Sequence, residues 1–184
     1  SADLRPSAAA GLRTRIDRLS ATARRLAEAQ ALAFYETFSD ADYRMLLPGA
    51  GAMEVERAIA ELLEAQVLMR DGSAYLIANR VWSQTLLEAL DAQRIRDTHG
   101  LLAGMYLQQR VIAFIPHAFA AGMDQEALQA FDLRNDMYRS EADYKTLYAQ
   151  GVGKLLWTYP RAIAAAQARG DNALQICDLR RWQY

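Results

Sequence analysis

The sequence predicts a mainly α-helical protein with one small β-hairpin. Apolar residues recur at spacings of three and four along most of the 184 residues, which is the period of amphipathic helices. Only one segment, around the pair Asp71-Gly72, combines turn residues with flanking β-branched or aromatic residues. Apolar residues make up 52% of the chain and charged residues 23%, so a packed core is expected and intrinsic disorder is excluded for most of the chain.

The first residues are small, polar and rich in alanine, and we expect residues 1–11 to be a linker without regular structure. From Leu12 onward the apolar residues have helical spacing as far as about Phe34. Ser20 is placed to cap a helix that begins at Ala21, because its hydroxyl can accept a hydrogen bond from the first turn.

Two shorter helices are predicted next. Residues 39–42 offer a cap and an acidic first turn for a helix that runs to Leu47 and ends at Pro48-Gly49. A clearer amphipathic helix covers residues 52–66. Its apolar face comprises Val55, Ile59, Leu62, Leu63 and Gln66.

The hairpin follows directly. Residues 67–70 and 74–77 are the predicted strands, and Asp71-Gly72 is the predicted turn, because this pair readily adopts positive φ angles. Three helical segments followed by a two-stranded wing is the element order of a winged helix. Residues 12–79 are therefore predicted to form a winged-helix-like module.

Residues 80–184 have the pattern of an antiparallel α-helical array. An apolar helix over residues 110–121 ends at Gly122, and Asp124 is placed to cap the next helix. Helix pairs of 30 to 35 residues are close to the tetratricopeptide period, so a tetratricopeptide-like array is predicted. Its later helices are expected over residues 124–139, 141–150, 154–168 and 171–182.

The composition of the chain excludes several classes of protein and of site. Lysine and arginine number 21 against 22 acidic residues, so no global positive charge drives binding to nucleic acid. A single cysteine, Cys177, excludes an intramolecular disulfide and a cysteine-rich zinc site. The longest apolar stretch, residues 111–119, is too short to span a membrane. We expect a cytoplasmic protein, and the start at Ser1 rather than Met indicates a fragment of a longer chain.

Three segments resemble the region that follows the nucleotide-binding module in signal-transduction ATPases of the STAND class, including large LuxR-type regulators. They are residues 16–26, residues 59–68 with Asp71-Gly72 and Tyr75, and residues 161–171. The resemblance implies a winged-helix arm and helical repeats that relay ligand or partner binding. Any ATPase activity would then reside in sequence absent from this chain.

No catalytic, cofactor or metal site is expected. Residues 151–154 end in Gly-Lys but lack the other P-loop positions, which hold Tyr148 and Leu155. His99 and His117 have no partner at metal-ligand spacing, and Cys177 lies among apolar residues. The carboxylate pairs Asp40 with Asp42 and Glu54 with Glu56 stand at helix starts, where the helix dipole explains them.

Direct DNA binding is the main alternative. The helix over residues 53–66, which would enter the groove, carries four glutamates and one arginine, a formal charge of −3, so contact through it is not expected. The first 25 residues hold six arginines and two aspartates, a formal charge of +4. The candidate contacts for a polyanion or an acidic partner are Arg13, Arg15, Arg18, Arg24 and Arg25.

The predicted function is that of a non-catalytic regulatory and interaction fragment. Its expected partner is another protein or an adjacent domain of the same polypeptide, and a small-molecule effector is compatible with the helical array. A winged-helix transcription regulator that binds DNA directly is the first alternative. An α-helical enzyme with an unrecognised site is the second.

Overall fold

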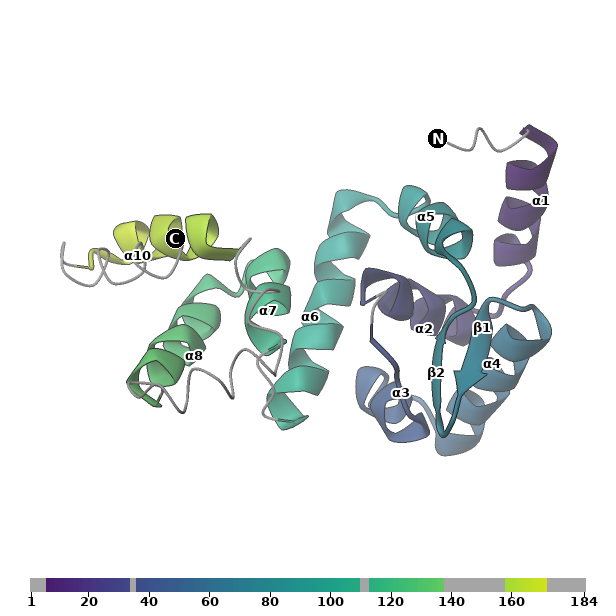
Figure 1. The fold of residues 1–184 in the computed structure, drawn as a ribbon, viewed down its shortest axis with the longest axis horizontal. Helices are drawn as coiled ribbons and strands as arrows, with labels where there is room; N and C mark the ends of the chain where they lie inside the picture. The colour runs from purple at the N-terminus through teal and green to yellow at the C-terminus, as the bar shows by residue number, and fades with distance from the viewer. Residues whose placement is uncertain (1–5, 34–35, 110–112, 138–157, 172–184) are drawn as a thin grey trace. The chain divides into compact units, whose positions relative to one another are not determined.

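A computed structural model describes residues 6–33, 36–109, 113–137 and 158–171 (Figure 1). The described chain is mainly helical with one small antiparallel hairpin, which confirms the predicted fold class. It forms two compact units, Ser1–Leu101 and Leu102–Tyr184. None of the helices in the described ranges is long and apolar enough to cross a membrane.

The first unit begins with four helices: α1 (Pro6–Asp17), α2 (Ala21–Leu32), α3 (Asp40–Leu46) and α4 (Ala52–Glu64). The prediction that residues 1–11 lack regular structure is wrong from Pro6 onward, because α1 starts there. Proline is tolerated in the first turn of a helix, where its missing N–H has no partner to lose. Ile16, which is 2% exposed, is the only described side chain of α1 in the core.

The predicted helix starts are confirmed by their caps. The Ser20 hydroxyl accepts a hydrogen bond from the Ala23 N–H at 3.2 Å. Ser39 and Asp42 form a reciprocal capping box at the start of α3. The predicted extension of α4 to Gln66 is wrong, because Gln66 has a φ of 55° and is exposed, whereas the helix ends at Glu64.

The hairpin consists of β1 (Leu68–Asp71) and β2 (Ala74–Ile77). Asp71 pairs with Ala74, so the two-residue loop is Gly72-Ser73 rather than the predicted Asp71-Gly72. Gly72, at the first loop position, has a φ of 60°, as a type II′ turn requires. Phe38 adds an antiparallel bridge to Tyr75, so a third segment joins the base of the wing.

Helix α2 lies at the centre of the first unit, where it packs against α4 and α5 (Arg80–Glu88). The predicted module boundary after Asn79 falls inside this unit. Asn79 instead caps α5 by accepting hydrogen bonds from two backbone N–H groups of its first turn. Helix α5 buries Trp82 and Leu86, and these apolar contacts hold it on the core of the first unit.

The unit boundary lies within α6 (Ala92–Gln109). The second unit contains α7 (Phe114–Ala121), α8 (Asp124–Met137) and α10 (Tyr159–Arg169), and α8 packs against both α7 and α10. Gly122 ends α7 at a φ of 85°, as predicted. Asp124 is the first residue of α8 rather than its cap. The predicted helices 141–150 and 171–182 lie outside the described residues, apart from Asp171 itself.

Candidate functional site

Helix α4 has one face in the core and one in solvent. Val55, Ala58, Ile59 and Leu62 are buried. The exposed residues on the opposite side recur at spacings of four, three and four, which places them in one line along the helix. We call this line the α4 outward face, and it comprises Met53, Arg57, Ala60 and Glu64. It is the surface with which a winged helix would enter a DNA groove.

The other three glutamates of α4 lie beside this face and bind neighbouring elements. Glu61 accepts hydrogen bonds from the Ser20 N–H at 2.7 Å and the Ser20 hydroxyl at 2.6 Å, so it supports the start of α2. Glu54 accepts a hydrogen bond from the Thr22 hydroxyl. These contacts tie two carboxylates of α4 to the first turn of α2.

Glu56 pairs with Arg44 of α3 at 2.9 Å. Glu54 and Glu56 remain exposed at the edges of this face, so the helix keeps its formal charge of −3, and among its four glutamates Glu56 has an arginine partner. The α4 outward face carries one arginine and one glutamate, and its formal charge is zero. A groove-binding face needs an excess of basic side chains, and this face has none.

The five candidate arginines do not form one free patch. Arg13 pairs with Glu88 of α5 at 3.5 Å. Arg15 donates a hydrogen bond to the carbonyl oxygen of Ala65, at the end of α4, and its guanidinium carbon lies 4.8 Å from the centroid of the Trp82 ring. Arg13 and Arg15 therefore attach α1 to the rest of the first unit, and they contribute to its packing.

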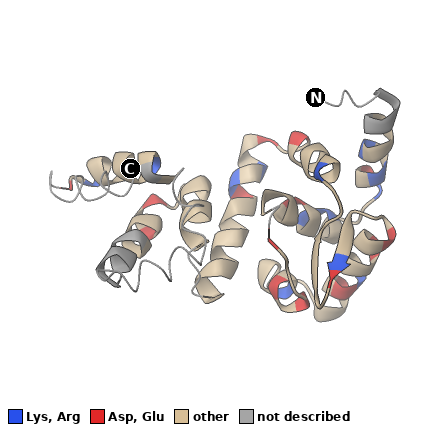
Figure 2. Cartoon of the chain, in the orientation of Figure 1, with Lys and Arg blue, Asp and Glu red and all other residues tan. Residues whose placement is uncertain are grey.

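Arg24 is also engaged, because it contacts Asp17 at 3.6 Å and Glu28 at 3.5 Å. Arg18 and Arg25 are exposed and have no ion-pair partner in the part of the chain that the structure describes. Of the five arginines predicted to contact a polyanion or an acidic partner, these two keep a free charge. Figure 2 shows that basic and acidic residues are interspersed on the helices of this unit.

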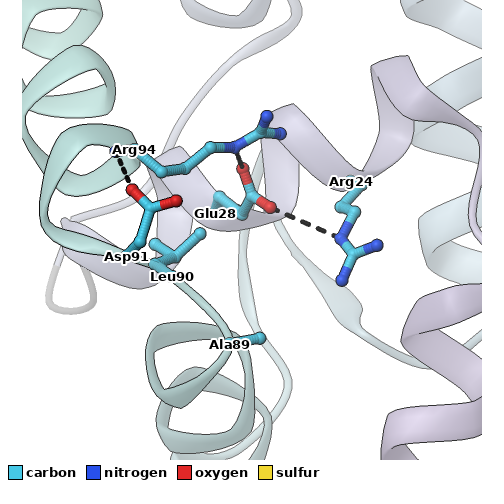
Figure 3. Close-up of a pocket in the computed structure, with 6 residues that line it drawn as sticks. All are labelled: Arg24, Glu28, Ala89, Leu90, Asp91 and Arg94. Atoms are coloured by element: carbon cyan, nitrogen blue, oxygen red, sulfur yellow. Dashed lines mark hydrogen bonds and ion pairs between the residues drawn. The ribbon is translucent and has the colours of Figure 1, made fainter.

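A charged cluster that the sequence analysis did not find lies between α2 and the start of α6 (Figure 3). The Glu28 side chain is only 4% exposed, and its two carboxylate oxygens face Arg24 and Arg94, the latter through Nε at 2.9 Å. Asp91 accepts a hydrogen bond from the Arg94 N–H at 2.7 Å and caps α6. A cavity of about 210 Å³ opens beside this cluster.

This cluster neutralises a buried charge rather than activating a group for chemistry. Two guanidinium groups compensate one carboxylate, and an arginine does not release a proton at physiological pH. The sequence contains one signal of the cluster, the spacing of four between Arg24 and Glu28 on a helix. The second arginine is 66 residues away in sequence, so only the fold brings it to Glu28.

Two buried tyrosines, one in α3 and one in β2, donate hydrogen bonds to polar side chains. The Tyr43 hydroxyl donates a hydrogen bond to Gln30 at 2.8 Å, and the Tyr75 hydroxyl donates one to Asp40 at 3.0 Å. Burial raises the pKa of both tyrosines, and the carboxylate of Asp40 adds to the rise at Tyr75. Both hydroxyls therefore stay protonated at neutral pH and act as structural donors.

The two histidines lie in different units, His99 in the first and His117 in the second. Burial lowers the pKa of His99, so its imidazole is neutral at pH 7. His117 is buried in α7 and stacks on Tyr106, with ring centroids 5.4 Å apart. Within the described ranges, no group of three or more His, Cys, Asp or Glu residues could hold a metal ion. Cys177 and residues 151–154 lie outside those ranges.

No protein-family model, curated protein or solved structure matches the chain significantly.

Proposed function

We propose that this chain is a non-catalytic regulatory and interaction fragment of a larger signal-transduction ATPase or transcription regulator. In this proposal the winged-helix-like part is an arm that contacts protein rather than DNA. The helices after it relay the binding of a partner or a small effector. The resemblance of three sequence segments to STAND-class proteins supports the assignment, and a cytoplasmic location belongs to it.

The composition of the α4 outward face is the observation that carries the proposal. A recognition helix gains affinity for DNA from lysine and arginine side chains that neutralise phosphates. Here Arg57 and Glu64 share the same face two turns apart, and Met53 is 66% exposed. A mixed face with an exposed methionine matches protein interfaces, which are enriched in methionine and arginine, better than a phosphate-binding surface.

The engagement of the arginines supports the same assignment. Arg13, Arg15 and Arg24 contact other groups of the first unit, so a DNA ligand would have to compete with contacts inside the protein. The order of helices and wing favours direct DNA binding as the alternative, because many winged helices bind DNA in this way. That support comes from the fold alone and not from the residues of the face.

Titration of labelled duplex DNA, followed by fluorescence anisotropy at about 50 and about 150 mM salt, separates the two functions. We expect no sequence-specific binding at the higher salt, and any weak association at the lower salt should fall in Arg18→Ala/Arg25→Ala. These two arginines are chosen because replacing Arg24 would also disturb Glu28. Specific binding that resists salt, survives this double change and is lost in Arg57→Ala would establish the DNA-binding alternative.

A further inference from the structure

We propose that the α4 outward face is a self-association surface, at which a second copy of this chain docks with its own α4 antiparallel to the first. The inference rests on the proposed function, since a dimer through this face would cover the surface that DNA would need. The occupant is a second copy because the charges of the face are complementary to the same face turned end to end.

The positions of the two charges create this self-complementarity. Arg57 and Glu64 are seven residues apart, about 10 Å along the helix axis, and Ala60 lies between them. When two such helices pack antiparallel about a two-fold axis near Ala60, each arginine lies opposite the glutamate of the other copy. One interface then contains two identical ion pairs, as an isologous contact requires.

Both side chains are available for this contact. Arg57 and Glu64 are exposed, and neither has an ion-pair partner among the residues that the structure describes. The other glutamates of α4 differ in this respect, because Glu54, Glu56 and Glu61 are bound to side chains of α2 and α3 or to the backbone of Ser20. The fold therefore leaves one charge of each sign on the α4 outward face.

The uncharged residues of the face fit the same arrangement. Ala60 is small and stands near the proposed two-fold axis, where a small side chain lets the two helices approach closely. Met53 is 66% exposed and lies one turn before Arg57, where it would cover the end of the partner helix. The proposed interface is only one helix face wide, and interfaces of this size form weak complexes. The dimer should therefore be sought at protein concentrations of roughly 0.1 to 1 mM.

Sedimentation equilibrium of the full chain tests the proposal. The wild type should show a monomer–dimer equilibrium in this concentration range. Arg57→Glu and Glu64→Arg should each weaken it about tenfold or more, because each change replaces two attractive contacts with two repulsive ones. An equimolar mixture of the two variants should associate about as well as the wild type, since every contact in the mixed pair joins opposite charges.

Arg25→Glu is the matched control, because it reverses an exposed arginine outside the face and should leave the dimer unchanged. A wild type that is monomeric throughout this range would overturn the proposal, and so would a mixture that associates no better than the variants alone. Thermal melting of each variant shows that it is folded. A chain that does not dimerise would refute this proposal without changing the result expected of the DNA titration. Specific duplex binding through Arg57 would refute the proposed function even if a dimer forms.

Discussion

Among the single side chains, Glu28 shows most clearly what a sequence cannot predict. Its spacing to Arg24 is visible in the sequence, but its burial and its second partner Arg94 depend on how α2 and the start of α6 pack. A buried carboxylate is stable only when its charge is compensated. The ion pair between Glu28 and Arg94 therefore stabilises the packing of α2 against the first turn of α6.

Arg94→Met should destabilise the first unit by about 2 kcal/mol. The change keeps much of the aliphatic volume but leaves the buried Glu28 with Arg24 alone, and an uncompensated buried charge is costly. Urea denaturation measures the effect. Arg25→Met, which removes an exposed arginine of α2, should shift the midpoint little. Equal midpoints for the two variants would show that the Arg94 contact does not stabilise the fold.

His99 should make stability depend on pH in the acidic range. Burial lowers its pKa in the folded state, so the unfolded chain binds the proton more readily. The contribution is fully present above the ordinary pKa of about 6.5 and is lost as the pH falls through the lowered value. Between about pH 7.5 and pH 5.5, His99→Gln should therefore lose less stability than the wild type. Parallel pH profiles of the urea midpoint would contradict this assignment.

The helices and the hairpin were predictable where their signals are local. Ser20 and the pair Ser39 with Asp42 form the predicted caps because a cap involves residues only three positions apart. The two strands follow from the apolar and turn residues around Gly72. The start of α1 was missed, since an alanine-rich segment with a proline resembles a linker until Ile16 is seen in the core.

Contacts between distant segments had no local signal. The β-bridge between Phe38 and Tyr75 joins residues 37 positions apart, and no turn or residue spacing in the sequence predicts it. Glu61 also has no local signal for its contact, because its spacing on α4 is that of a solvated residue. In the structure it accepts two hydrogen bonds from Ser20, the residue that caps α2. The charge of α4 can be counted from the sequence, whereas the partners of its carboxylates depend on the fold.

Gly72→Val should destabilise the wing by about 1 to 2 kcal/mol. Gly72 has a φ of 60°, which a β-branched residue adopts only with strain. An added Cβ would meet no atom within 4 Å, so the penalty comes from the backbone and not from a steric clash. Gly72→Asn is the matched control and should cost less, because asparagine tolerates positive φ. Thermal unfolding distinguishes the two variants. Equal melting temperatures for Gly72→Val and Gly72→Asn would argue against the positive φ of Gly72.

Over the described residues, the sequence predicts the mainly α-helical fold with one hairpin better than it predicts which charged residues are free. The candidate arginines were selected by charge, yet Arg13, Arg15 and Arg24 serve packing within the first unit. Which charges remain free depends on tertiary contacts. On α4, Glu54, Glu56 and Glu61 contact neighbouring elements, and these contacts distinguish them from the residues of the α4 outward face.

The most direct measurement places an environment-sensitive fluorophore on the α4 outward face. The variant Met53→Cys/Cys177→Ser carries the label at an exposed position of α4. We expect its emission to change when unlabelled chain is added at high concentration and to stay constant when random-sequence duplex DNA is added at about 150 mM salt. A change with duplex DNA and none with protein would contradict the assignment of this face to protein binding.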